Sequence, residues 1–150
     1  MKYDDASWHY GGEFPESSPN EYGATHIALF LKWCFSKGWA GELHLEGEPE
    51  AVEQVLSGTL AASDFFVKYC DEKLTNEDLN SEGNTFVEKY YGDDGLYLSD
   101  YAANFPEHMY VVSEQEHDYA KFEAMLDSRL ESGILESGQI RPSRWWRFWE

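Results

Sequence analysis

The feature that most constrains the fold of this chain is one apolar run, residues 23–41, in an otherwise very acidic sequence. Its apolar residues recur at the spacing of one helical face: Ile27, Leu31, Cys34 and Phe35. Neighbouring apolar residues widen that face until little polar surface remains, which is typical of a buried helix. The run therefore predicts a central core helix, with Thr25 as its N-cap and Gly38 just past its end.

Capping signals and apolar spacing predict further short helices along the chain. We expect them after Glu48, after Ser63, at the capping box Thr75–Asp78, after a turn at 80–84, ahead of Pro106, and after the capping box Ser113–Glu116. The apolar faces of the first two of these helices include Leu56 and Val67. The last helix carries an amphipathic stripe: Tyr119, Phe122, Met125, Leu126, Leu130 and Ile134.

Strand signals are short and few. Residues 1–22 predict an extended arm, in which Trp8, Tyr10 and Phe14 alternate as in a short strand. Alternation over 42–46 predicts a second, half-exposed strand, and 109–112 is a third β-prone run. The sum is a mainly α fold, with α+β possible: a single compact domain over 1–150, of five or six short helices and two or three short strands.

The charge of the chain restricts its partners. It carries 29 acidic and 11 basic side chains, a net charge of -18. Such a surface disfavours nucleic acid and anionic membranes, both of which attract Lys and Arg. It favours a basic protein partner, or serves solubility alone. Because no signal peptide or membrane-spanning run is recognisable, we expect a cytoplasmic protein.

The C-terminal segment 138–150 differs from the rest, because its three Arg outnumber its one Glu. Three Trp and one Phe accompany these charges, and such rings are costly to leave in water. We expect this aromatic and basic tail to pack on the acidic body. The alternative is a tail that binds a partner or nucleic acid, since aromatics interleaved with Arg also stack on bases.

Motifs for catalysis or cofactor binding are missing. The sequence has no phosphate-binding glycine loop, nucleophile elbow or zinc-protease motif. The five histidines lie far from one another and from both cysteines, so spacing supports no zinc site. Cys34 and Cys70 are expected to be buried free thiols, and His9, beside Asp4 and Asp5, a surface hydrogen-bonding residue. We therefore expect no enzyme, no metal and no cofactor.

Three segments of the chain carry a family resemblance: residues 1–12, 23–27 and 71–80. Together they resemble an uncharacterised family of small acidic bacterial proteins, which is similar to the immunity proteins of secreted polymorphic toxins, including those of type VI secretion. The resemblance implies a non-enzymatic protein that binds and neutralises a cognate toxin. It implies no catalytic residues.

These observations lead to one principal hypothesis, an immunity protein whose acidic surface covers the active site of a toxin with a basic surface. The expected contact residues are exposed acids and flanking aromatics: Asp4, Asp5, Trp8, His9, Asp71, Glu72, Glu77, Asp78, Glu82, Asp93 and Asp94. One alternative is a small metal-dependent or histidine-using hydrolase, built on His9, His26 or His44 with nearby carboxylates. Two of these histidines and a carboxylate meeting in one pocket would favour it. Another alternative is an acidic mimic of nucleic acid, with its carboxylates along one elongated face.

Overall fold

A computed structural model describes residues 1–9, 20–91, 96–106 and 113–132 of the protein. Within these residues it contains seven α-helices and one two-stranded antiparallel sheet, so the prediction of a mainly helical domain is confirmed. The helices are α1 (Thr25–Ser36), α2 (Glu42–Gly47), α3 (Pro49–Ser57), α4 (Ala62–Cys70), α5 (Ser81–Tyr90), α6 (Tyr97–Asn104) and α7 (Tyr119–Glu131). None of them is long and apolar enough to cross a membrane.

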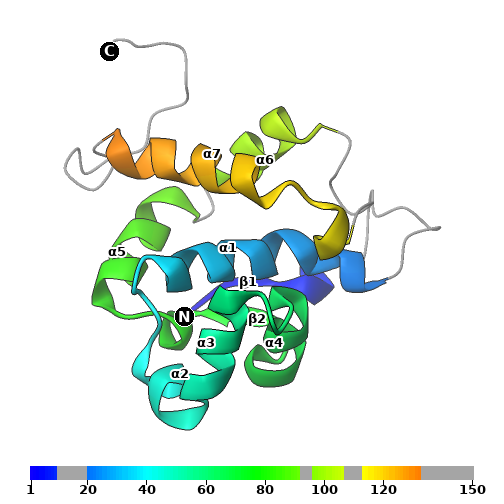
Figure 1. The fold of residues 1–150 in the computed structure, drawn as a ribbon. Coiled ribbons are helices and arrows are strands. Elements are labelled where there is room, and N and C mark those ends of the chain that lie inside the picture. Colours follow the sequence, from blue (N-terminus) through cyan, green and yellow to red (C-terminus); the bar gives the residue numbers. More distant parts are fainter. Residues whose placement is uncertain (10–19, 92–95, 107–112, 133–150) are drawn as a thin grey trace.

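Helix α1 is the centre of the fold (Figure 1). It runs through the middle of the molecule, with α6 and α7 on one side and α2, α3 and α4 on the other. Ten of its twelve residues are buried, which confirms the predicted core helix. Gly38 adopts φ +80, the left-handed conformation predicted after the helix end. The predicted cap is wrong, because the N-cap is Ala24 and Thr25 is already a buried helical residue.

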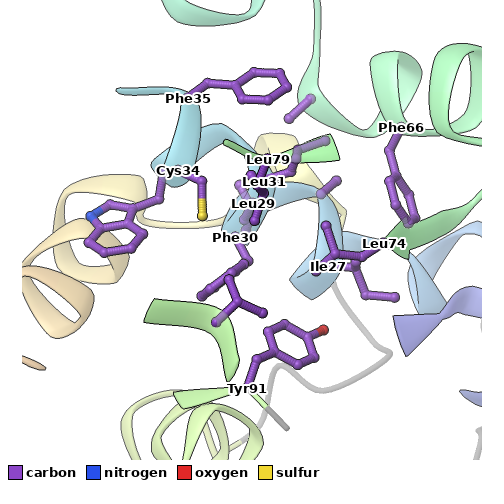
Figure 2. Close-up of a cluster of buried hydrophobic side chains, with 14 of the residues drawn as sticks. Ile27, Leu29, Phe30, Leu31, Cys34, Phe35, Phe66, Leu74, Leu79 and Tyr91 are labelled. Atoms are coloured by element: carbon purple, nitrogen blue, oxygen red, sulfur yellow. The ribbon is translucent and has the colours of Figure 1, made fainter. Parts of the chain in front are cut away.

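The core around α1 is dominated by aromatic rings and leucines (Figure 2). Phe30 packs edge-on against Tyr91, with ring centroids 4.9 Å apart. Its ring is tilted against that of Tyr97, with centroids 4.8 Å apart. From the next turns, Trp33 and Cys34 are fully buried. Both cysteines are buried and free, as predicted. A single apolar core therefore joins α1 to the helices on both of its sides.

The sheet pairs the N-terminal strand with a strand about seventy residues further along the chain. Strand β1 (Lys2–Asp5) pairs antiparallel with β2 (Lys73–Thr75). The predicted strand around Trp8 is wrong, because Ala6–His9 forms a 3-10 helix, η1. Tyr10 and Phe14, like the β-prone run 109–112 and the tail 138–150, lie outside the described residues.

The strand predicted over 42–46 is also wrong, since this segment forms α2. A five-residue segment in which only one side chain is buried fits a short strand and a single helical turn equally well. That side chain is His44, which is fully buried, whereas Leu43 and Leu45 are exposed. This segment is therefore a helix that buries one histidine, and not a strand with one buried face.

Helix α3 starts at Pro49 and is followed by Gly58 at φ +84, so both predicted ends are confirmed. Leu56, however, is exposed, and so is Val67 of α4, which corrects their predicted place on apolar faces. Of the predicted stripe on α7, Phe122 and Leu126 are buried.

Two capping boxes begin different elements from those predicted. Thr75 and Asp78 do form reciprocal cap hydrogen bonds, but they open a short 3-10 helix, η3 (Asn76–Asp78). Helix α5 instead starts within the predicted turn, where the side chain of Asn80 accepts from the Gly83 N–H at 2.9 Å. The segment after Ser113 likewise forms a 3-10 helix, η4 (Glu114–Glu116). Helix α7 follows it, capped by Asp118. A local box therefore starts a helical turn without determining its length.

The cap of α4 comes from a distant part of the chain. Ala61 is its N-cap position and supplies no side-chain cap. The carboxylate of Glu114 accepts from the N–H groups of Ala62 at 2.9 Å and Ser63 at 2.7 Å. A carboxylate at a helix N-terminus also interacts favourably with the helix dipole. The predicted local cap by Ser63 and Asp64 is therefore replaced by a tertiary contact.

Gly41 lies where the α1–α2 connection approaches η3. Its N–H donates to the Asp78 carbonyl at 3.0 Å. A Cβ at this position would lie 2.5 Å from the Glu77 carbonyl oxygen, a backbone atom that cannot rotate away. We expect Gly41→Ala to lower the free energy of unfolding by about 1–3 kcal/mol through overpacking. Urea denaturation measures this, with Gly47→Ala as the control because a Cβ there meets no atom within 4 Å. Equal stability of the two variants would contradict the close approach.

Candidate functional site

The structure divides the predicted contact residues into three groups. Asp4, Asp5 and Asp78 are buried, so their predicted exposure is wrong. The exposed or half-exposed members are Trp8, Asp71, Glu72, Glu77 and Glu82, and His9 is also only partly buried. Asp93 and Asp94 lie outside the described residues.

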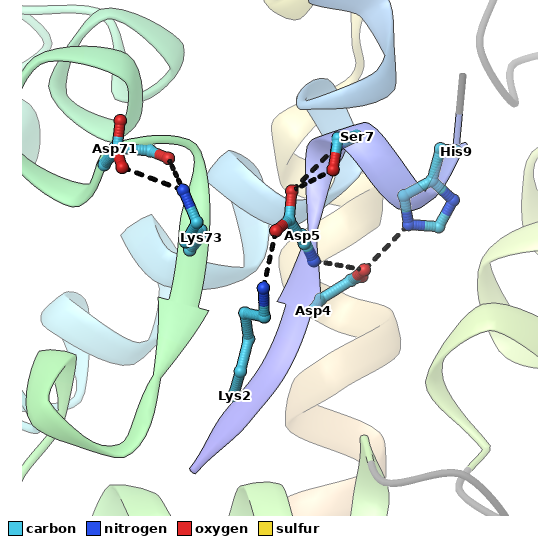
Figure 3. Close-up of polar contacts among 7 residues, drawn as sticks. All are labelled: Lys2, Asp4, Asp5, Ser7, His9, Asp71 and Lys73. Atoms are coloured by element: carbon cyan, nitrogen blue, oxygen red, sulfur yellow. Dashed lines mark hydrogen bonds and ion pairs between the residues drawn. The ribbon is translucent and has the colours of Figure 1, made fainter.

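Asp5 has a structural role at the end of β1 (Figure 3). It forms an ion pair with Lys2 at 2.8 Å. Its other oxygen accepts from the Ser7 N–H at 2.9 Å and the Ser7 hydroxyl at 2.7 Å. Burial alone would raise the pKa of Asp5, but the contacts with Lys2 and Ser7 lower it to about 2. The carboxylate therefore holds η1 against β1 and offers little to a partner.

Asp4 is the centre of a buried polar network that also includes His9, His26 and Tyr91. Its Oδ1 contacts the His9 Nε2 at 2.8 Å and accepts from the Asp5 N–H (Figure 3). Its Oδ2 accepts from the Tyr91 hydroxyl and lies 3.6 Å from the His26 Nε2. We call these four residues, Asp4, His9, His26 and Tyr91, the Asp4 network.

Electrostatics in the Asp4 network favour an ionised carboxylate next to a neutral histidine. Burial would raise the pKa of Asp4, but contacts with His26 and His9 hold it well below its usual range. Burial lowers the pKa of His26, and Asp4 offsets this only in part. Both pKa shifts make the folded protein less stable as the pH falls, because in both cases the unfolded chain takes up a proton more readily than the folded protein.

This network gives the protein an expected sensitivity to acid. A depressed folded-state pKa contributes stability that is lost as the pH falls: below about 6.5 for His26 and below about 3.8 for Asp4. Between pH 7 and pH 5, we expect wild type to lose up to about 1.4 kcal/mol per pH unit relative to His26→Gln. Urea unfolding of both proteins measures this. The difference between their free energies of unfolding removes the contribution of titrating groups that the two proteins share. A difference that stays constant with pH would contradict a neutral buried His26.

A second buried cluster combines residues from α2, α4 and η3. His44 lies between two carboxylates, with its Nδ1 2.5 Å from Glu48 Oε1 and its Nε2 2.7 Å from Asp78 Oδ1. The Cys70 Sγ lies 3.8 Å from the same Nε2. We call His44, Cys70 and Asp78, with Glu48 behind them, the His44 cluster.

The charges of the His44 cluster are unusual for a protein interior. Burial would lower the pKa of His44, but Asp78 and Glu48 more than offset this and raise it. Burial, followed by the same two carboxylates, raises the pKa of the Cys70 thiol far above its usual range. Because the nucleophilic form of cysteine is the thiolate, this cluster is not an activated cysteine–histidine pair.

The exposed surface of α2 and α3 is acidic. Between Lys37 and Lys68 the sequence has six acidic residues and no Lys or Arg. We give the name acidic corner to four exposed acids of these helices together with the two exposed leucines of α2: Glu42, Leu43, Leu45, Glu46, Glu50 and Glu53. The two helices lie side by side at one end of the molecule (Figure 1).

Sequence reasoning named His9, His26 and His44, and it placed only His9 beside its partner Asp4, which it contacts in the structure. The Asp4 network combines residues up to 87 positions apart, and the His44 cluster spans 34. The prediction against a zinc site used spacing along the chain, which does not detect donors that meet only in the tertiary structure. Cys70 and Tyr91 carried no signal of their roles.

These features define a mainly helical domain with buried acid–histidine clusters and an acidic surface. The chain belongs to a family described as Domain of unknown function (DUF7832), whose sequence profile matches residues 2–117. That match includes both clusters and the acidic corner, and it ends before α7. No curated protein and no solved structure is significantly similar to the chain.

Proposed function

We propose that this protein is a non-enzymatic binding protein of the immunity type, which neutralises a toxin by covering a basic surface around the toxin's active site. The observation that carries the proposal is the acidic corner, a surface with exposed leucines among acids and no basic side chain. Interfaces combine an apolar centre with a polar rim, and complementary charge speeds association. Leu43 and Leu45 supply the apolar part, being 54% and 49% exposed.

The acidic middle of the chain, residues 71–82, is less suited to this role. Asp71 is paired with Lys73 at 2.8 Å (Figure 3), and Asp78 belongs to the buried His44 cluster. Glu77 and Glu82 remain exposed and extend the negative surface. We therefore assign the principal contact to the acidic corner, with the acidic middle as a secondary contribution.

The experiment starts with purification of the protein from its native host at low salt and identification of bound proteins by mass spectrometry. Each candidate is then expressed with and without this protein, and rescue of growth identifies a toxin that it neutralises. A host in which every co-purifying protein is harmless, or stays toxic on co-expression, would contradict the immunity hypothesis.

The contact surface is tested separately with the identified toxin. We expect Glu42→Gln with Glu46→Gln to slow association about tenfold at low salt, because charge steers the encounter. The difference should shrink at high salt, where charges are screened. The matched control is Glu88→Gln with Glu131→Gln, which removes two exposed charges from α5 and α7. Equal rates for the two double variants would place the contact elsewhere.

A specific observation supports a second candidate, a hydrolase that uses histidine. His9, His26 and Asp4 converge, which is the arrangement that this alternative requires. It ranks second because Asp4 and His26 are buried, and both Asp4 oxygens already have contacts within the network. A panel of ester and phosphodiester substrates tests it, with His9→Gln as the variant. Turnover by wild type that this variant abolishes would establish the second candidate, and a lack of turnover by wild type would remove it.

A further inference from the structure

We propose that the His44 cluster is a binding site for a divalent transition-metal ion of the zinc class, with His44 Nε2, Cys70 Sγ and Asp78 Oδ1 as its ligands. One nitrogen, one sulfur and one oxygen donor form a set that Zn²⁺ and Co²⁺ accept, whereas Mg²⁺ and Ca²⁺ prefer oxygen alone. The three donor atoms lie within 4.8 Å of one another.

The donor spacing is close to that of a tetrahedral site. Zinc bonds of about 2.0 Å to nitrogen and oxygen and about 2.3 Å to sulfur place nitrogen and sulfur about 3.5 Å apart, and nitrogen and oxygen about 3.3 Å apart. The observed distances from His44 Nε2 are 3.8 Å to Cys70 Sγ and 2.7 Å to Asp78 Oδ1. Binding would require Sγ to approach by a few tenths of an ångström and Asp78 to withdraw by about half an ångström.

The contacts behind the donors are those of a metal centre. A metal-ligating histidine usually donates its other ring N–H to a carboxylate, which fixes the ring and its tautomer. Glu48 occupies this position, with its Oε1 2.5 Å from His44 Nδ1. The second oxygen of Asp78 accepts from the Thr75 N–H at 2.8 Å, so the carboxylate is also oriented.

The donors are buried beside aromatic rings. His44 is fully buried, and its ring packs edge-on against Phe65 and Phe35, with centroids 5.1 and 5.9 Å away. Cys70 and Asp78 are also buried. The donors come from α2, α4 and η3, so a bound ion would link three elements of the fold. Three protein ligands leave the fourth tetrahedral position to water.

Charge and protons balance in this site. The ion replaces the proton on His44 Nε2 and the proton on the Cys70 thiol, and both protons pass to solvent. The two positive charges of the ion are then matched by the thiolate and the Asp78 carboxylate, while Glu48 keeps its contact with Nδ1. The Asp4 network, the other cluster of metal-ligating residue types in the described residues, has no sulfur donor.

The experiment uses the full chain, refolded with one equivalent of Co²⁺ after removal of metals by chelation. We expect visible bands of tetrahedral cobalt and a thiolate-to-cobalt charge-transfer band in the near ultraviolet. Cys70→Ala should lose the charge-transfer band, while Cys34→Ala, the matched variant at the other buried thiol, should keep it. Circular dichroism confirms that each protein is folded.

A second pair of variants tests the contact behind His44 without changing a ligand. Glu48→Gln should weaken Co²⁺ and Zn²⁺ binding about 10–100-fold, as expected when a carboxylate behind a histidine ligand is lost. Glu50→Gln, an exposed neighbour, should leave affinity unchanged. Folded wild type that shows no charge-transfer band, or equal bands in the two cysteine variants, would overturn the proposal. If Glu48→Gln and Glu50→Gln bind equally well, the assigned geometry is wrong.

Discussion

Replacing Asp4 with alanine is expected to lower the free energy of unfolding by about 3–5 kcal/mol, the usual cost of removing one partner from a buried charged network. Asp4 is 3% exposed, and its two oxygens meet the Asp5 N–H, the His9 ring and the Tyr91 hydroxyl. Alanine would leave these groups, together with the nearby ring of His26, without their shared acceptor. Because whole-protein stability is typically about 5–15 kcal/mol, the variant should lose a large share of its stability.

Two further variants make this expectation specific. Asp4→Asn keeps one acceptor oxygen and should cost less than alanine, since it removes the charge but not every hydrogen bond. Glu77→Ala is the control, because that side chain is exposed. Chemical denaturation of all three variants measures the differences. If Asp4→Ala were as stable as Glu77→Ala, the Asp4 network would not contribute to the fold.

Truncation of Phe30 to alanine should destabilise the protein by about 3–5 kcal/mol, through lost burial and the cavity left behind. Phe30 is fully buried at the centre of α1. Its ring contacts Tyr91 and Tyr97 from the opposite side of the core. Trp33 of the same helix has its ring centroid 6.0 Å from that of Phe30. These large neighbours are themselves packed and cannot all move inward, so the cavity should persist.

Val67→Ala on α4 is the matched control for Phe30→Ala. Val67 is 48% exposed, so its truncation should change stability by no more than about 0.5 kcal/mol. Urea denaturation monitored by circular dichroism gives both values. A cost below about 1.5 kcal/mol for Phe30→Ala would mean that the core around α1 repacks easily, contrary to the close packing of Phe30 on Tyr91 and Tyr97.

The buried acids show where reasoning from composition is misleading. Most acidic side chains in proteins are exposed, and those that are buried are almost always paired. Asp4, Asp5 and Asp78 were therefore natural candidates for surface contacts, yet each is buried with histidine, lysine or backbone partners. None of the predicted contact residues belongs to the acidic corner, whose first helix was predicted as a strand. Its net charge was readable from the sequence, but the exposure of Leu43 and Leu45 was not.

Elements whose signals lie within a few residues of one another were predictable from the sequence. These include the burial of α1, the left-handed Gly38 after it, Pro49 and Gly58 at the ends of α3, and the capping hydrogen bonds of Thr75 and Asp78. Helix ends and apolar faces depend on contacts three or four residues apart, so local order is enough to predict them.

The polar groups that meet in the interior could not be predicted from the sequence, because long-range packing brings them together. Glu114 caps α4 from more than fifty positions away, and Asp4 reaches Tyr91 across the molecule. His44 is buried in a helix because Asp78 and Glu48 satisfy both of its ring nitrogens. A buried charge must have a partner, but the need for a partner does not specify its position in the chain. Packing brings the partners together, and both acid–histidine clusters of this protein are consequences of that packing.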